Sequence, residues 1–213
     1  MQAIMESLFD VCYLAFAILT GVTLLRRSNG QLVRLLGISA LVLGCGDAFH
    51  LVPRVMDYWL PGDYTALLGI GKLVTSITMT VFYLLIEYAR RERYHIQGEK
   101  AVLCAFWVLA GLRIALCLFP QNAWTSADSP VSWGIYRNLP FAVMGVLSIL
   151  TWLKSDRQDR PLRLMWLAIL LSFLFYFPVV LWADVLPIIG MMMLPKTCMY
   201  IWILCMFRAV SKE

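Results

Sequence analysis

Two lysines stand in long apolar stretches of the chain, where a charged side chain is costly. Lys72 lies 19 residues after Pro53, and Lys196 lies 18 residues after Pro178, so the two occupy matching places. An ammonium group inside a membrane span costs at least several kcal/mol unless a counter-charge or a polar partner compensates it. The pair therefore predicts a polar site within the protein, with two positive charges that would bind an anion.

Further polar residues accompany the two lysines. Asp47, His50 and Arg54 are spaced i, i+3 and i+7, so they share one face of a helix. The other candidates lie in the same half of their spans and complete the predicted site: Arg113, Arg137, Asn138, Tyr176 and Tyr200. Five of these ten residues are cationic and Asp47 is the one deep acid, so the site favours a carboxylate or a phosphate. Asp47 and His50 could also carry a coupling proton.

Some of these residues also suit plainer roles. Arg113 and Arg137 lie within about a turn and a half of a span end, where long basic side chains snorkel to the membrane interface, and we favour that account for both. His50 would equally suit a hydrogen bond to Asp47 or to a backbone carbonyl, and Asp47 a structural ion pair with one lysine. Only two histidines occur, predicted on opposite sides of the membrane, whereas catalytic zinc needs three protein ligands together. The sequence indicates no metal and no cofactor.

The elements that must position these residues are membrane-spanning helices. The chain has 213 residues, of which 61% are hydrophobic and only 15% are charged, and its mean hydropathy is +0.76. These values exclude a soluble domain and predict an all-α polytopic membrane protein, in one membrane domain over 1–213. The predicted spans are 5–25, 33–58, 64–89, 101–118, 132–153, 163–184 and 187–208. We take the first as a helix of the mature protein, because 1–6 contains no basic residue. All six cysteines fall within these spans, which disfavours a disulfide framework.

Basic residues predict the orientation. The loops and tail on one side carry thirteen of them: Arg26, Arg27, Arg34, Arg90, Arg91, Arg93, Lys100, Lys154, Arg157, Arg160, Arg163, Arg208 and Lys212. The other side carries Arg54. By the positive-inside rule the N-terminus faces outward and the C-terminus faces the cytoplasm, in a plasma membrane of bacterial type. The net charge of +5 is thereby attributed to topology, and nucleic acid is not an expected partner. Lys72 and Lys196 then lie about 12–14 Å inside the outer end.

An internal repeat is suggested when the chain is shifted by about 125 residues. The segment 14–17 then falls on 139–142, Pro53 on Pro178, and Lys72 one residue from Lys196. We expect three-helix units over 1–95 and 126–213, joined by a linker helix in 96–125. Parallel repeats of this kind are a known transporter plan, with the substrate site near the midplane between the repeats.

By this architecture, and by Pro53, Pro140 and Pro178, the chain resembles the seven-helix three-plus-one-plus-three class that includes SWEET sugar transporters and PQ-loop proteins. The resemblance implies that polar residues of the third and seventh helices contact the substrate. Lys72 and Lys196 occupy those helices. A lysine pair in these places points away from a neutral sugar and toward a small anionic solute, bound in an outward-facing cavity of a transporter.

A second resemblance is local. Gly46-Asp47, within the segment 41–53, is similar to the small-Gly-Asp helix of lysoplasmalogenase-type membrane proteins. It implies a membrane-embedded lipid hydrolase, in which Asp47 and His50 would activate water. The equivalent position in the second half holds Ser172 instead of a second aspartate. This alternative leaves enzymatic activity open, although the residues favour a binder or a transporter.

Two further hypotheses about the function remain. An opsin-like photoreceptor would use Lys196 as a Schiff base and Asp47 as its counter-ion, but it leaves Lys72 unexplained. A sensor or assembly subunit without chemistry of its own would leave no mark in the sequence. The partners we expect are the lipid bilayer and a small anionic solute or lipid, and a homo-oligomer is compatible with the sequence.

Overall fold

The apolar stretches fold into helices in the computed structural model, which describes residues 2–27, 30–126, 129–155, 158–183 and 185–213. Within these ranges 83% of the residues are helical and no strand occurs, so the predicted all-α class is confirmed. The described residues form seven α-helices: α1 (Gln2–Arg26), α2 (Gln31–Trp59), α3 (Thr65–Arg93), α4 (Lys100–Leu118), α5 (Val131–Lys154), α6 (Met165–Trp182) and α7 (Met193–Val210). Each is part of a segment long and apolar enough to cross a membrane, as predicted.

Prolines shape several of these helices. We expected one helix over 187–208, whereas a 3-10 turn, η2 (Pro187–Met192), precedes α7. The turn begins with proline, which suits a position where no helical N–H is needed. Another 3-10 turn, η1 (Pro120–Asn122), follows α4. Pro53, Pro140 and Pro178 lie inside α2, α5 and α6, where the carbonyls they leave free are tolerated if a polar cavity is near.

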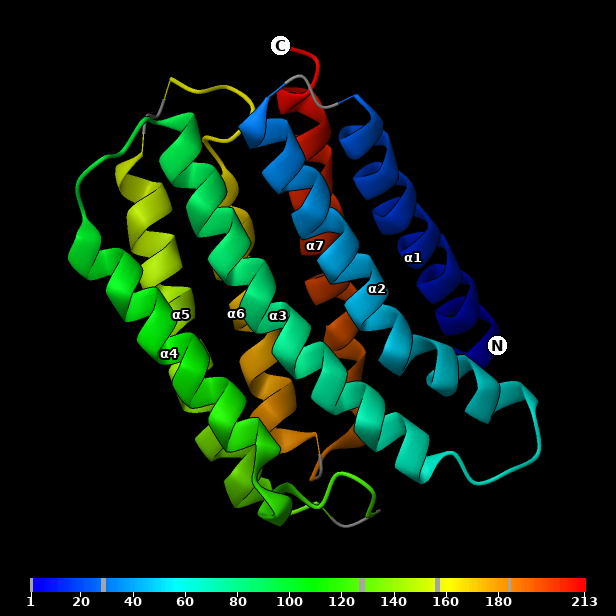
Figure 1. Ribbon diagram of the computed structural model, residues 1–213. Coiled ribbons are helices and arrows are strands. Elements are labelled where there is room, and N and C mark those ends of the chain that lie inside the picture. Colours follow the sequence, from blue (N-terminus) through cyan, green and yellow to red (C-terminus); the bar gives the residue numbers. More distant parts are fainter. Residues whose placement is uncertain (1, 28–29, 127–128, 156–157, 184) are drawn as a thin grey trace.

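The helices are arranged so that neighbours in sequence pack against each other, and α7 closes the bundle against α1 and α2. Helix α3 also packs against α5. The N-terminus and the connections α2–α3, α4–α5 and α6–α7 lie at one end of the bundle, here called the N-terminal end (Figure 1). The C-terminus lies at the opposite, C-terminal end. This arrangement does not confirm the predicted three-plus-one-plus-three repeat.

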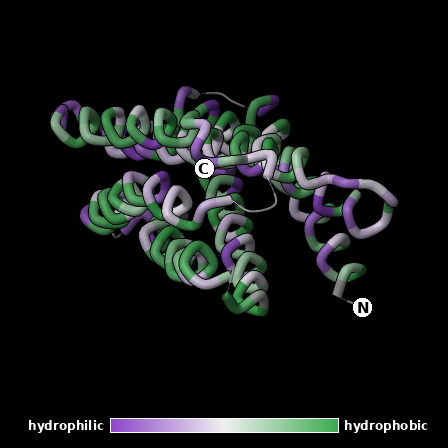
Figure 2. The backbone as a smooth tube through the Cα atoms, turned by 90° about the horizontal axis from the view of Figure 1, so that it is seen from below, coloured by the Kyte–Doolittle hydropathy of each residue, from purple (hydrophilic) through white to green (hydrophobic). Residues whose placement is uncertain are grey.

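The outside of the bundle is apolar. Leu19, Phe49, Val108, Leu139 and Leu174 are each more than half exposed, although they lie in the middle of helices. Figure 2 shows that hydrophobic residues dominate the helices and that hydrophilic residues interrupt them. Apolar surface of this extent is untypical of a soluble monomer, because water would contact it directly. The surface fits an integral membrane protein whose helices face lipid.

Close backbone packing organises the N-terminal end. A Cβ on Gly71 of α3 would overlap the backbone carbonyl of Phe49 in α2. A Cβ on Gly69 would overlap the backbone carbonyl of Trp124, which lies in the α4–α5 connection. Only glycine permits such contacts, because it carries no side chain. The two glycines therefore hold α2 and the α4–α5 connection directly against the first turns of α3.

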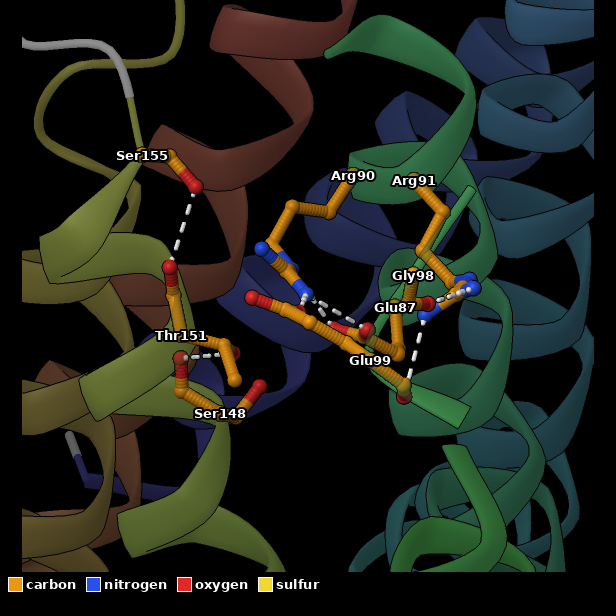
Figure 3. A network of polar contacts seen from close by, with 8 residues as sticks. All are labelled: Glu87, Arg90, Arg91, Gly98, Glu99, Ser148, Thr151 and Ser155. Carbon is orange, nitrogen blue, oxygen red and sulfur yellow. Dashed lines mark hydrogen bonds and ion pairs between the residues drawn. The ribbon is translucent and has the colours of Figure 1, made fainter. Parts of the chain in front are cut away.

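A buried ion pair lies at the C-terminal end (Figure 3). Arg90 donates from Nε and Nη2 to the two carboxylate oxygens of Glu87, both at 2.8 Å, and from Nη2 to Glu99 Oε2 at 2.6 Å. Glu87 is 0% exposed and Arg90 is 2% exposed. Ser148 of α5 lies across from this group in Figure 3. Arg90 is therefore a structural residue of the helix packing, which its place in a basic run did not predict.

The basic residues of the predicted cytoplasmic loops gather at this C-terminal end, because they flank the helix termini that meet there. Arg157, one of the thirteen, lies outside the described residues. The described basic residues of these loops thus lie at one end of the bundle, as the assignment of the loops to two sides predicted. Which end faces the cytoplasm stays a prediction.

Candidate functional site

A cavity of about 550 Å³ lies at the N-terminal end of the bundle. Its walls come from α2 to α7 and from the α4–α5 connection, while α1 contributes no described lining residue. Seven of the ten predicted site residues line it: His50, Lys72, Arg113, Arg137, Asn138, Tyr176 and Lys196. Residues from six helices, separated by up to 146 positions from His50 to Lys196, thus meet in one place.

The charge of the cavity is one-sided. Lys72 of α3, Arg113 of α4, Arg137 of α5 and Lys196 of α7 all line it, one cation from each of four helices. No Asp or Glu occurs among its described lining residues. Positive groups that converge in a space of low dielectric reinforce one another and attract anions. The lining is therefore an anion-attracting surface.

Arg113 lies deepest of the four. It is 2% exposed, and its guanidinium carbon lies 3.4 Å from the centroid of the Phe141 ring on α5. Its Nε and Nη1 have no hydrogen-bond partner in the part of the chain that the structure describes. We expected this side chain to snorkel to the membrane interface, and that expectation is wrong. The aromatic face attracts the guanidinium into the bundle instead.

Arg137 is held at the side of the cavity by the α4–α5 connection. Its Nη1 donates to Asn122 Oδ1 at 2.9 Å, and its guanidinium carbon lies 4.3 Å from the Trp124 ring centroid. Asn122 is wholly buried and donates from Nδ2 to the carbonyls of Leu116 and Phe119, so its oxygen is fixed toward Arg137. Arg137 thus lines the cavity with fixed neighbours near the start of α5, and the interface snorkelling that we expected of it stays a prediction.

Lys196 lies above two aromatic rings. Its Nζ lies 4.7 Å from the Tyr176 ring centroid and 5.5 Å from that of Tyr200. The Tyr176 hydroxyl donates to Asn138 Oδ1 at 2.8 Å, and Asn138 Nδ2 donates to the Gly134 carbonyl at 2.8 Å. These hydrogen bonds connect α6 to α5 and fix the ring that Lys196 contacts. Tyr200 itself is 2% exposed and packs beneath the site without lining the cavity.

Lys72 and His50 line the cavity from α3 and α2. Lys72 is exposed, and its backbone carbonyl accepts a hydrogen bond from Ser76 Oγ at 2.7 Å. Nδ1 of His50 is buried and has no hydrogen-bond partner among the residues that the structure describes. His50 therefore offers a polar ring atom next to a cavity that cations from four helices line.

The first turn of α3 begins at the cavity. Thr65 lines the cavity, and its backbone N–H donates to Asp63 Oδ1 at 2.9 Å. This hydrogen bond lowers the pKa of the Asp63 carboxyl below its ordinary value. An ionised carboxylate is favourable at a helix N-terminus, where backbone N–H groups point outward. Asp63 fixes the start of α3 without lining the cavity.

Asp47 and Arg54 are the predicted residues that point elsewhere. Asp47 accepts a hydrogen bond of 2.6 Å from the Tyr13 hydroxyl of α1, and its carboxylate interacts electrostatically with Lys196. Arg54 Nη2 donates to Glu6 Oε2 of α1 at 2.6 Å. The spacing of Asp47, His50 and Arg54 predicted one shared face of α2. Asp47 and Arg54 instead bind partners on α1, and of the three only His50 is among the described residues that line the cavity.

Several contributing residues were missed in the sequence. Glu6 and Asp10 of α1 are 5% and 6% exposed, so Asp47 is not the one deep acid that we expected. An aspartate within an apolar span is itself a signal, and Asp10 could have been found by it. Asn122 and Trp124 lie in a connection, where no helical periodicity marks a residue that reaches a site.

The described residues contain no group of three or more His, Cys, Asp and Glu side chains placed to hold a metal ion. No known protein family, curated protein or solved structure matches this chain. The resemblances to SWEET transporters and to lysoplasmalogenases therefore gain no support from relatives.

Proposed function

We propose that this protein is a multi-pass membrane protein that binds a small organic anion in the cavity at its N-terminal end and carries it across the bilayer. The observation that carries the proposal is the lining with one cation from each of α3, α4, α5 and α7 and no acid among its described residues. Positive charge gathered in a low-dielectric interior is costly, and a bound anion lowers that cost.

The size of the cavity favours an organic anion over an inorganic one. Its volume of about 550 Å³ falls within the range of about 300–1,000 Å³ that is typical of sites for small organic molecules. A single water molecule takes about 30 Å³ in the liquid, and a halide ion would leave most of the space unfilled. Aromatic side chains such as Phe141 and Tyr176 add apolar contact area for a carbon skeleton.

Transport is supported by the difference between the two ends of the bundle. The N-terminal end contains the cavity, while the C-terminal end contains the buried Glu87–Arg90 pair, which Glu99 at the start of α4 also contacts. A protein with a ligand site at one end and a packed polar contact at the other suits alternating access, in which the two ends open in turn.

The two alternative activities fit the cavity less well. A hydrolase that used Asp47 would need this carboxylate in contact with substrate, but Asp47 is bound by Tyr13 and does not line the cavity. A photoreceptor with retinal on Lys196 would place an apolar ligand beside Lys72, Arg113 and Arg137. Neither arrangement compensates the positive charge.

The test is ligand-dependent thermal unfolding of the protein in detergent. We expect organic carboxylates or phosphate esters to raise Tm, because a ligand at about 100 times its Kd stabilises the folded state by about 2.7 kcal/mol. Neutral sugars and organic ammonium ions serve as negative ligands. Lys196→Gln should abolish the shift, while Lys100→Gln, which removes an exposed positive charge at the start of α4, should retain it.

Uptake of a stabilising anion into proteoliposomes then tests transport. We expect wild-type protein and Lys100→Gln to exchange labelled anion, and Lys72→Ala and Lys196→Ala to lose most of the exchange. Uptake that survives both alanine substitutions unchanged would contradict the cavity as the substrate site. Absence of any anion that raises Tm would contradict the proposed function itself.

A further inference from the structure

The four cations of the cavity differ in depth and in surroundings. Arg113 and Lys196 lie over the aromatic floor formed by Phe141 and Tyr176, and their charges interact with each other. Lys72 is exposed, and Arg137 is half-buried beside the α4–α5 connection. We call Arg113 and Lys196 the floor cations, and Lys72 and Arg137 the mouth cations.

The floor cations are only partly compensated by the protein. Asp47 interacts electrostatically with Lys196, whereas no acid in the described part of the chain is a named partner of Arg113. Arg113 keeps two buried donors, Nε and Nη1, without a hydrogen-bond partner among the described residues. A buried guanidinium in this state is stabilised most by an oxyanion, which both accepts from its donors and balances its charge. One negative group is therefore required at the floor.

Arg137 requires a second negative group at the mouth. Its named polar partner, Asn122, is a neutral amide, and its aromatic partner, Trp124, is also uncharged. These contacts orient the guanidinium without balancing its charge. Because Arg137 belongs to α5 and stacks on the α4–α5 connection, whereas Lys196 belongs to α7, the charges that need balancing come from separate walls of the cavity.

The lining contains apolar side chains as well as the four cations. Leu68, Met79, Val179, Val180 and Met193 line the cavity together with the cations. A ligand with an oxyanion at each end and a hydrocarbon chain between them matches this distribution. Such a ligand also fills a volume of about 550 Å³ better than a compact ion does.

We propose that the cavity selects linear organic dianions, with one terminal oxyanion at Arg113 and Lys196 and the other at Arg137 and Lys72. This inference rests on the proposed function, since it names the ligand class of the same cavity. Specificity follows because a monoanion leaves one guanidinium without a counter-charge, while a diamine or a neutral chain is repelled or gains nothing.

The test compares linear dicarboxylates with the monocarboxylates of equal chain length and with the matching diamines. Binding is measured with the full chain in detergent by titration calorimetry, and the fluorescence of the tryptophans, with Trp124 in the lining, gives a second readout. We expect a dicarboxylate to bind the wild-type protein at least about tenfold more tightly than its monocarboxylate. Diamines should not bind.

Variants assign each end. Arg137→Gln should bring the affinity for the dicarboxylate down to that for the monocarboxylate, and Arg137→Lys should keep part of the preference. Arg113→Gln should weaken the binding of both the dicarboxylate and the monocarboxylate. Gel filtration reports whether Arg113→Gln folds. If it does not, the test still rests on the two Arg137 variants, because Arg137 is half-buried and Arg137→Lys keeps the charge.

Three results separate the claims. Equal affinity of wild-type protein for mono- and dicarboxylates overturns the dianion inference and leaves the anion-binding function standing. Failure of every organic anion to bind overturns the proposed function, and the dianion inference with it. A preference that Arg137→Gln leaves unchanged also overturns the inference, because the second oxyanion would then lie elsewhere.

Discussion

Individual charged residues of this protein are either balanced within the chain or arranged around the cavity. Glu6 with Arg54 and Glu87 with Arg90 are buried or half-buried pairs with carboxylate and guanidinium in direct contact. Arg113 is buried to the same degree as Arg90, yet it contacts an aromatic ring instead of a carboxylate. This contrast separates structural charges from those available to a ligand.

Arg113 should therefore lower the stability of the folded protein when no ligand is bound. Replacing buried ion pairs with apolar residues of similar volume is often stabilising, by about 1–4 kcal/mol, and an incompletely paired charge has less Coulomb energy to lose. We expect Arg113→Met to raise Tm in the absence of ligand and to abolish the Tm shift that an organic anion produces. A lower Tm for Arg113→Met than for wild type, measured without ligand, would contradict this account of Arg113.

Glu87 should behave in the opposite way. Glu87→Gln removes one partner of a buried pair and leaves the Arg90 charge poorly balanced, which costs about 3–5 kcal/mol in comparable cases. The matched control is Glu213→Gln. Glu213 also pairs with an arginine, Arg93, but the Glu213 side chain is 45% exposed. Surface pairs contribute about 0–1 kcal/mol, so this control should leave Tm nearly unchanged. Equal effects of the two substitutions on Tm would show that burial of the Glu87 pair does not matter.

Among the elements, α3 has the largest part in the site. It contributes Lys72, contacts α2 through Gly71, and supports the α4–α5 connection through Gly69. That connection in turn holds Arg137 through Asn122 and Trp124. The side wall of the cavity is thus positioned by a contact between a helix and a loop, whereas the floor is positioned by helices alone.

Gly69→Ala should disturb the wall specifically. The added methyl group overlaps the Trp124 carbonyl, so the connection must shift away from α3. Overpacking of this kind costs about 1–3 kcal/mol, and the displaced Trp124 should also weaken anion binding. Gly111→Ala is the control, because a Cβ on this α4 glycine meets nothing within 4 Å. It should hold or raise Tm, since alanine favours a helix over glycine by about 1 kcal/mol. Unfolding curves and anion titrations of the two variants give the comparison.

Considered as a whole, the molecule separates its positive charge into two regions. Basic residues of the helix termini gather at the C-terminal end, and the four cavity cations lie near the N-terminal end. The first group predicts that the C-terminal end faces the cytoplasm. The cavity would then open on the outer side, where the proposed anion ligand would enter.

Topology reporters test this orientation directly. We expect a fluorescent protein fused after Glu213 to be folded and fluorescent, and a phosphatase fused at the same point to be inactive, because the fusion point lies in the cytoplasm. A reporter in the connection 60–64 should give the reverse result. An active phosphatase after Glu213 would invert the predicted topology and place the cavity on the inner side.

The sequence was sufficient for the helices and for the four cations that line the cavity. Hydropathy alone located seven spans, because lipid imposes length and composition on each helix independently. Lys72 and Lys196 were found because a charge in an apolar span is rare. Arg54 and Asp47 were misplaced because their partners, Glu6 and Tyr13, lie on another helix, and contact between helices is not encoded in spacing along one of them. Arg113 was misjudged because its aromatic neighbour lies on α5.

The distribution of the four cations over four helices has a mechanical consequence. Without a ligand, α3, α4, α5 and α7 carry like charges toward a common space and push each other apart, so the empty cavity resists contraction. An anion reverses the sign of this force and draws the same helices inward. In the proposed transport, binding would then narrow the entrance behind the ligand, and the ligand itself would favour the conformation that opens at the other end.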